Sequence, residues 1–178
     1  GIMEQIEIKS ISDKFFVAFK DLYSISFPIF EQRTEAQQMK AFTCPDYHLL
    51  CFVENEVFIG FIAYWELDHC LYIEHFAIHQ LLRGKGYGSR VLKEYLKMAN
   101  KTVVLEIDPI TDEVSEARLH FYKRCGFVEN VYDHVHSPYR EDYKAHHLEV
   151  LSFHSGLAPE EYASFNCQLT QVVMTKYL

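Results

Sequence analysis

The amino-acid sequence predicts an α/β (α+β) fold in a single domain, residues 1–178. Its periodicities predict strands and helices in the order β α α β β β α β α β β α, an order typical of helices packed on a mixed sheet. Of the 178 residues, 49% are hydrophobic and 15% aromatic. Such a chain can bury a core without disulfides, and its composition excludes a disordered protein, a coiled coil and a collagen-like repeat.

The first half of the chain predicts two helices between a strand and a three-stranded meander. Apolar residues recur at helical spacing from Phe15 to Tyr23, whereas the next helix is polar and therefore exposed. Glu54-Asn55-Glu56 separates two β-rich runs, as in a hairpin. The elements expected are a strand at Ile6–Ser10, a helix capped by Ser12 or Asp13 and ended by Pro28, a helix at Glu31–Phe42, and strands at His48–Val53, Val57–Trp65 and Cys70–Ile78.

The second half predicts three helices that alternate with strands. The helix from about Gly86 to Asn100 presents an apolar face that includes Val91, Leu92 and Tyr95. The helix that follows Thr111 or Asp112 ends at Gly126, a residue typical of helix C-termini. The remaining elements expected are strands at Thr102–Ile107, Phe127–His136 and His147–Phe153, and a last helix whose first turn holds Pro159, Glu160 and Glu161.

Charge and hydropathy exclude two classes of partner. With 25 acidic and 17 basic residues the net charge is −8, so the chain lacks the excess of Lys and Arg that favours binding to nucleic-acid phosphates. No stretch approaches the ~18 continuous apolar residues of a membrane span. The N-terminus lacks the basic and apolar regions of a signal peptide. We therefore expect a cytoplasmic protein with neither a nucleic-acid nor a membrane partner.

Cysteine and histidine patterns favour neither disulfides nor a metal. The five Cys are an odd number, none lies in a C-x-x-C pair, and most have apolar neighbours, as reduced thiols of the cytoplasm do. The pairs His134/His136 and His146/His147 suggest a metal, but no Cys or carboxylate cluster completes a tetrahedral set by spacing. We expect no metal site.

Glycine is scarce in this chain and concentrated at one place. Of the 7 Gly, three lie within Gly84–Gly88, directly before an amphipathic helix. Glycines permit positive φ angles, so that successive N–H groups can point inward and bind an anion together with the helix N-terminus. Arg83 and Lys85 add positive charge. The segment predicts a cradle for a phosphate or pyrophosphate, with a plain glycine-rich turn as the alternative.

Spacing separates this segment from two other phosphate loops. The pattern G-x-x-x-x-G-K-[ST] of the P-loop is absent. The dinucleotide fingerprint requires G-x-G-x-x-G close to a strand end, whereas here the spacing is G-x-G-x-G and a loop separates Ile78 from Gly84. A nucleotide-dependent oxidoreductase is therefore disfavoured.

Two motifs at the right separation resemble those of one enzyme superfamily. Arg83-Gly84-Lys85-Gly86-Tyr87-Gly88 is similar to the [QR]-x-x-G-x-[GA] loop of the GNAT N-acetyltransferases, and it follows the strand Cys70–Ile78 as in that superfamily. Phe121-Tyr122-Lys123-Arg124-Cys125-Gly126-Phe127 resembles its second signature, F-Y-x-x-x-G-F. The resemblance covers roughly residues 6–136. It implies a GNAT-like, mostly antiparallel sheet of seven strands with helices on both faces.

The resemblance implies where acetyl-CoA binds. In GNAT proteins the strand that corresponds to Cys70–Ile78 parts from the strand that corresponds to Thr102–Ile107, and acetyl-CoA enters the gap as co-substrate. Backbone groups of Phe76, Ala77 and Ile78 would then pair with the pantetheine arm. The pyrophosphate would lie on backbone N–H groups of Arg83, Gly84, Lys85, Gly86, Tyr87, Gly88 and Ser89.

The resemblance and the strand pattern together suggest catalytic residues. Tyr122 occupies the tyrosine position of the second motif, and a phenol can donate a proton to a departing thiolate. Glu74 and Glu106 are candidate bases, because each is an acid in an otherwise apolar strand beside the gap. Strict alternation places Glu74 on one face with Tyr72 and Phe76, and puts His75 with Ile73 and Ala77 on the other.

The function expected is the transfer of an acetyl group from acetyl-CoA to a primary amine of a small molecule or peptide. The alternative is a non-catalytic CoA-binding sensor or scaffold of the same fold. Phe27, Phe30 and Phe42 lie where GNAT proteins build the acceptor pocket, although core packing explains such residues equally. Because dimers are common in the GNAT superfamily, the resemblance also implies a possible homodimer. The sequence identifies neither the amine, the base nor the role of residues 137–178.

Overall fold

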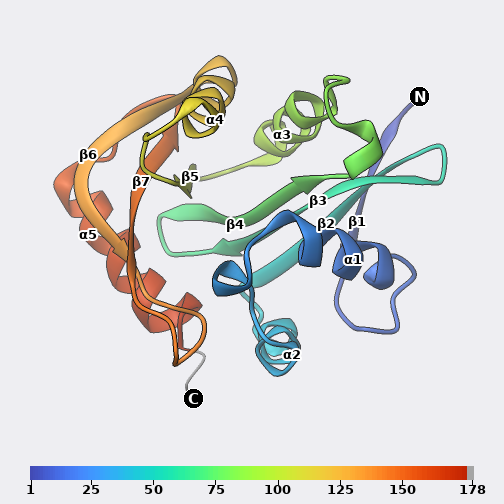
Figure 1. Ribbon diagram of the computed structural model, residues 1–178, viewed down its shortest axis with the longest axis horizontal. Coiled ribbons are helices and arrows are strands. Elements are labelled where there is room, and N and C mark those ends of the chain that lie inside the picture. The colour runs from blue at the N-terminus through green and yellow to red at the C-terminus, as the bar shows by residue number, and fades with distance from the viewer. Residues whose placement is uncertain (176–178) are drawn as a thin grey trace.

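The computed structural model describes residues 1–175 and contains a seven-stranded sheet in the order β1-β2-β3-β4-β5-β7-β6 (Figure 1). Only β4 and β5 pair in parallel, and every other neighbouring pair in this sheet is antiparallel. The predicted fold class is therefore confirmed. The strands are β1 (Met3–Ile8), β2 (Tyr47–Glu54), β3 (Val57–Glu66), β4 (Cys70–Ile78), β5 (Thr102–Ile107), β6 (Phe127–His136) and β7 (His146–Phe153).

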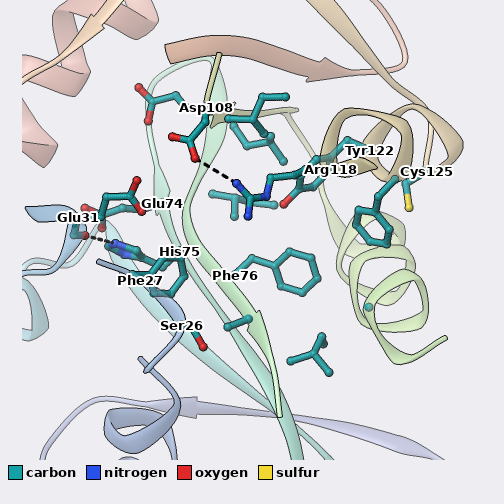
Figure 2. Close-up of a pocket in the computed structure, with 18 of the residues that line it drawn as sticks. Ser26, Phe27, Glu31, Glu74, His75, Phe76, Asp108, Arg118, Tyr122 and Cys125 are labelled. Atoms are coloured by element: carbon teal, nitrogen blue, oxygen red, sulfur yellow. Dashed lines mark hydrogen bonds and ion pairs between the residues drawn. The ribbon is translucent and has the colours of Figure 1, made fainter. Parts of the chain in front are cut away.

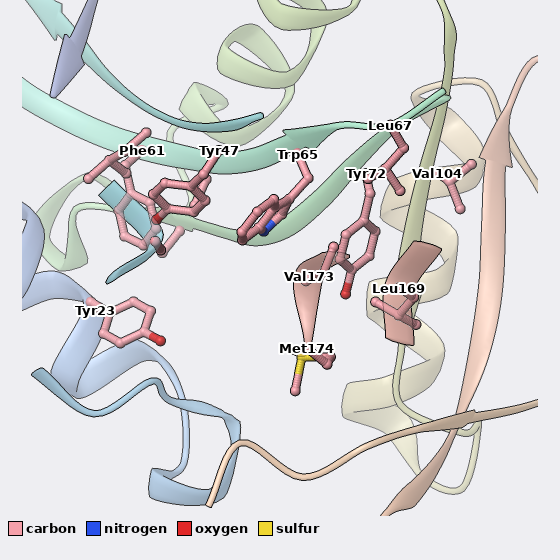
Figure 3. Close-up of a cluster of buried hydrophobic side chains, with 14 of the residues drawn as sticks. Tyr23, Tyr47, Phe61, Trp65, Leu67, Tyr72, Val104, Leu169, Val173 and Met174 are labelled. Carbon is pink, nitrogen blue, oxygen red and sulfur yellow. The ribbon is translucent and has the colours of Figure 1, made fainter. Parts of the chain in front are cut away.

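Helices cover both faces of the sheet and bury two separate cores. Helices α1 (Phe16–Ser26), α2 (Glu35–Thr43) and α5 (Pro159–Gln168) pack on one face, and α3 (Tyr87–Met98) and α4 (Glu113–Arg124) on the other (Figure 1). The first core is rich in aromatic side chains, as Figure 3 shows. No helix in the described part of the chain is long and apolar enough to cross a membrane.

Local signals set most helix ends where the sequence predicts them. Asp112 caps α4 by accepting a hydrogen bond from the Ser115 N–H at 2.8 Å, and Gly126, with φ +100°, follows its C-terminus. Pro159 lies in the first turn of α5, which continues as a π-helical segment over Leu169–Val173. Each of these residues acts on its immediate neighbours, so the helix ends that they set can be predicted from the sequence alone.

The helix predicted over Glu31–Phe42 is wrong at its start. A 3-10 turn, η1 (Ile29–Glu31), precedes α2, and Thr34 caps α2 in a capping box with Gln37. The first predicted helix also begins later than expected, because the Asp13 carboxylate accepts hydrogen bonds from the N–H groups of Lys9 and Ser10 instead of capping it. The chain between α1 and α2 is therefore a loop that can line a cleft.

Strand β4 carries a bulge that changes which side chains share a face. Ala63 pairs with His75 and Tyr64 with Ile73, so Glu74 is an extra residue between them. Glu74 and His75 consequently both lie toward the first core, whereas Phe76 packs against the second. The prediction that Glu74 and Phe76 share a face opposite His75 is wrong, because strict alternation fails at a bulge.

Strands β4 and β5 part halfway along their length. Their parallel pairing runs from Cys70–Thr102 to Ile73–Leu105 and then stops, while β5 continues to pair with β7 as far as Ile107. The residues of β4 after Ile73 keep their bonds to β3. The backbone groups on the other edge of β4 therefore face an opening in the sheet.

A buried ion pair ties the surroundings of this opening together. The Arg33 Nη2 donates to Glu74 Oε2 at 2.7 Å and to the Val173 carbonyl at 3.2 Å, and the two charged side chains are 4% and 0% exposed. Trp65 Nε1 and the Tyr139 hydroxyl each donate to the same carboxylate at 2.8 Å. Glu74 thus links the α1–α2 loop, the loop after β6 and the C-terminal segment to the sheet.

Loss of the Glu74 charge should destabilise the fold strongly. In Glu74→Gln the Arg33 guanidinium remains buried without a countercharge, so we expect the free energy of unfolding to fall by about 3–5 kcal/mol at pH 7. Urea titration followed by circular dichroism measures this change. Glu35→Gln removes an exposed ion pair with Lys20 and should cost less than about 1 kcal/mol. Equal effects of the two substitutions would contradict a structural role for the pair.

Stability should also depend on pH through Glu74. Burial alone raises the pKa of this carboxyl, but Arg33, His75 and the hydrogen bonds outweigh it and lower the pKa from 4.5 to about 2. The unfolded state then binds more protons, so the stabilisation is complete above about pH 5 and is lost as the pH falls toward 2. Unfolding curves across this range should show a steeper loss in the wild type than in Glu74→Gln.

Candidate active site

The opening between β4 and β5 leads into a cleft of about 1050 Å³. Its walls come from β4, β5, the α1–α2 loop, the start of α3, α4, and residues at the β6–β7 end of the sheet. Figure 2 shows side chains of the α1–α2 loop, β4, the end of β5 and α4 around the cleft. Phe27 and Phe30 line it, whereas Phe42 packs in the first core against Phe16 and Tyr47. The aromatic residues predicted for an acceptor pocket are therefore divided between cleft and core.

A glycine turn forms the end of the cleft nearest α3. After β4 and a short 3-10 turn, η2 (Gln80–Leu82), the chain passes through Gly84 at φ +78° and Gly86 at φ +82°. A Cβ added at either position would meet no atom within 4 Å, so these glycines are required by backbone conformation and not by crowding. Gly86 also caps α3, and no side chain of the described residues caps this helix. The first N–H groups of α3 are therefore free to bind an anion.

Most of the residues predicted to bind acetyl-CoA border this cleft. They are Phe76, Ala77, Ile78, Arg83, Gly84, Gly86, Gly88 and Ser89. Lys85 is exposed outside the lining, and the Tyr87 side chain lies under the Arg90 guanidinium, 5.2 Å from its ring centre, with its hydroxyl 3.4 Å from Glu54. Of these last two residues, only the backbone could contribute to the cleft.

Tyr122 extends from α4 into the cleft from the side opposite β4 (Figure 2). Its ring packs edge-on against Phe121 and Phe127. Burial raises the pKa of the phenol to about 12, with smaller effects from Arg118 and Cys125. The hydroxyl is therefore protonated at neutral pH and can act as a proton donor.

Glu74 borders the cleft, but its oxygens are occupied. Oε1 accepts from Trp65, and Oε2 accepts from Arg33 and Tyr139. Together with the pKa of about 2, these bonds leave the carboxylate ionised and a weak proton acceptor.

Glu106 lies across the cleft in a second buried network. Its side chain is 5% exposed and accepts hydrogen bonds from the Tyr72 hydroxyl and, at 2.5 Å, from His134 Nε2. His136 Nε2 lies 3.8 Å away, and His134 Nδ1 contacts the Tyr162 hydroxyl of α5 at 2.7 Å. Burial raises the pKa of Glu106, but His136, His134 and Tyr72 together lower it below its usual value. His134 and His136 thus surround a carboxylate, and no group of three metal-ligating side chains occurs within residues 1–175.

The cleft also contains charged residues that the sequence does not single out. Asp108 pairs with Arg118 at 3.1 Å, and Glu31 of η1 projects from the α1–α2 loop. Burial, with the nearby charges of Asp108 and Glu106, raises the pKa of Glu31 to about 7, although Arg118 opposes the shift. The sequence places Glu31 in an exposed polar helix, so no sequence signal distinguishes it from surface acids.

Comparison with known proteins agrees with this geometry. The sequence model of the acetyltransferase (GNAT) family matches residues 16–127. No curated protein matches the chain significantly. A solved structure from Bacteroides thetaiotaomicron that is assigned to the GNAT family superposes with a TM-score of 0.90 at 26% identity, over 96% of this chain and 98% of that chain.

Two more distant structures share the fold. Arabidopsis thaliana Naa50, in complex with the bisubstrate analogue CoA-Ac-MVNAL, has a TM-score of 0.60 at 21% identity over 84% of this chain and 97% of its own. A spermidine N-acetyltransferase chimera from Vibrio cholerae SpeG and hSSAT has a TM-score of 0.62 at 12% identity, covering 85% of this chain and 94% of its own. The family match spans more than half of the chain and includes both the glycine turn and the Tyr122 motif, and the chain therefore belongs to the acetyltransferase (GNAT) family.

Proposed function

We propose that this acetyltransferase transfers the acetyl group of acetyl-CoA to the primary amine of a small molecule or peptide. One observation carries the proposal: a cleft opens where β4 leaves β5 and ends at the glycine turn before α3. A long ligand with an anionic end fits this arrangement, because β4 pairs with β5 no further than Ile73 and no side chain of the described residues caps the start of α3.

The backbone supplies most of the proposed binding site. The pantetheine arm pairs with the free edge of β4 at Phe76, Ala77 and Ile78, as an added strand would. The pyrophosphate lies on N–H groups between Arg83 and Ser89, including those of Lys85 and Tyr87, whose side chains do not line the cleft. An N–H of the Phe76–Ile78 segment stabilises the oxyanion that develops on the acetyl carbonyl.

Tyr122 acts as the proposed acid. The neutral amine nitrogen forms a bond to the acetyl carbon, and the bond between this carbon and the CoA sulfur breaks. Tyr122 donates its phenol proton to the departing sulfur, and the proton that the nitrogen releases after attack restores the phenol, directly or through water. The net release is one proton for each ammonium ion that is acetylated.

The two carboxylates predicted as bases are better suited to other tasks. Glu74 is bound by three donors, and we propose that it holds the walls of the cleft in place. Glu106 is ionised between His134 and Tyr72, and we propose that its negative charge attracts a cationic acceptor and orients these two side chains. Neither offers an unoccupied, weakly acidic carboxyl for direct proton transfer.

Acetyl-CoA binding and amine turnover test the function. Isothermal titration should show binding of acetyl-CoA, and no binding at millimolar concentration would refute the proposal. A panel of polyamines, amino acids, aminoglycosides and free peptide N-termini, with CoA release followed by a thiol reagent, should identify the acceptor. Binding without turnover on any amine would favour the non-catalytic sensor instead.

A side chain at Gly86 should abolish binding of acetyl-CoA. Valine at φ +82° is strained by about 1–3 kcal/mol, so in Gly86→Val the turn moves and its N–H groups lose their common direction. Glu56→Val is the matched control, because it places the same residue at φ 64° in the β2–β3 hairpin, away from the cleft. Both variants should lose stability, and only Gly86→Val should lose binding in titration calorimetry. Retained binding in Gly86→Val would exclude the pyrophosphate cradle.

Removal of the Tyr122 hydroxyl should slow catalysis without weakening binding. Tyr122→Phe should lower kcat by about 10²-fold, the usual contribution of a general acid, with the Kd of acetyl-CoA nearly unchanged. Tyr95→Phe provides the control, because the Tyr95 hydroxyl is buried in the second core and has no hydrogen-bond partner among residues 1–175. Steady-state kinetics with the amine of highest kcat/KM in the panel measures kcat for both variants, and titration calorimetry measures their Kd for acetyl-CoA. An undiminished kcat in Tyr122→Phe would show that the Tyr122 hydroxyl is not the proton donor.

A further inference from the structure

We propose that Glu31 is the catalytic base of this enzyme, and that its carboxylate binds the acceptor's ammonium group and takes a proton from it. The inference rests on the proposed function, because it assigns a residue to the acceptor side of the same cleft. The sequence predicts Glu74 or Glu106 for this role, and Glu31 lies in a segment that it predicts as an exposed helix.

The partners of the acidic side chains in the cleft point to Glu31. Four carboxylates line the cleft: Glu31, Glu74, Glu106 and Asp108. Glu74 is paired with Arg33, Glu106 with His134 and Asp108 with Arg118. Within residues 1–175 the Glu31 carboxylate has no hydrogen bond or ion pair, and the contacts of Glu31 are made by its backbone. It is therefore the carboxylate that remains available to a substrate.

The backbone of Glu31 is fixed at the edge of the cleft. His75 Nε2 lies 2.8 Å from the Glu31 carbonyl oxygen, and the His75 ring packs against Phe27, 4.8 Å between ring centres. Arg140 Nε donates to the carbonyl of the next residue, Gln32, at 3.3 Å. Figure 2 shows Glu31 beside Glu74 and His75, at the end of the cleft away from α3. An amine that reaches the acetyl group from the α1–α2 loop would pass this carboxylate.

The charges around Glu31 suit proton exchange near neutral pH. The titratable and charged groups that line the same part of the cleft are Glu74 and His75 of β4, Glu106 and Asp108 at the end of β5, Arg118 of α4, and His136 and His146 of β6 and β7. Burial is the largest effect on the Glu31 pKa, and Asp108 and Glu106 add to it. With a pKa of about 7, both protonation states are populated at neutral pH, as an effective base requires.

With Glu31 as the base, both protons that the ammonium nitrogen loses are accounted for. An ammonium ion transfers one proton to the Glu31 carboxylate and becomes the neutral amine that attacks the acetyl carbon. After the amide has formed and CoA has left as the thiol, Glu31 returns the proton to solvent. The second proton of the nitrogen passes to the CoA sulfur through Tyr122, as described above. No further reactant is required.

The pH dependence of kcat/KM distinguishes a base from a merely structural residue. With the amine of highest kcat/KM in the panel, wild-type activity should rise with pH through a group of pKa about 7. Glu31→Gln should lower kcat/KM by roughly 10²-fold and remove this limb, so that only the ionisation of the amine itself remains. Glu31→Asp should retain the limb at reduced rate. Glu35→Gln, an exposed acid four residues away, should match the wild type.

Two further measurements separate the possible failures. Acetyl-CoA binding by Glu31→Gln should equal that of the wild type in titration calorimetry; if the wild type itself does not bind acetyl-CoA, the proposed function fails first. NMR of glutamate side-chain carboxyl carbons should show one resonance that titrates near pH 7 in the wild type and is missing in Glu31→Gln. If no such resonance exists, or if Glu31→Gln keeps the wild-type profile, Glu31 is not the base and the proposed function still stands.

Discussion

The ion pair between Arg33 and Glu74 is the interaction on which the geometry of the cleft depends. A buried guanidinium and carboxylate tolerate little displacement, because separation would leave each charge without a partner in an apolar interior. The pair holds the α1–α2 loop and the C-terminal segment against β4 at the point where β4 has left β5. The same hydrogen bonds occupy both oxygens of Glu74, which supports the proposal that this carboxylate has a structural task. Of the four carboxylates that line the cleft among the described residues, we propose Glu31 for proton exchange.

The cleft itself is a consequence of backbone pairing. Beyond Ile73, β4 remains paired only with β3, and β5 remains paired with β7. The two parallel strands therefore diverge, and backbone hydrogen-bonding groups are exposed at the opening between them. Unpaired backbone groups are costly unless water or a ligand satisfies them. The proposed binding of acetyl-CoA in this cleft therefore relies on main-chain atoms of β4 more than on particular side chains.

The sequence predicts the parts of this structure that depend on local signals. The strands are recognisable from their β-rich apolar runs. The glycine turn and the end of α4 are recognisable because Gly84, Gly86 and Gly126 each act on adjacent residues. The faces of β4 are not predictable, since the bulge at Glu74 arises from the pairing register with β3. Glu31 is hidden for a similar reason: only the folded loop reveals that it is half-buried and near Asp108. The partners of Glu74 come from residues 41 and 65 positions away, beyond any local pattern.

The strand order β5-β7-β6 has a consequence for how the protein is made. Strand β5 is synthesised well before β7, its antiparallel neighbour, which spans His146–Phe153 near the end of the chain. During translation β4 alone protects one edge of β5, over four residue pairs, and the other edge stays open until the ribosome has released β7. Open strand edges recruit other chains. The wall of the cleft that holds Glu106 is thus complete only once β7 has paired with β5, and until then its open edge is a site where partly folded chains can aggregate.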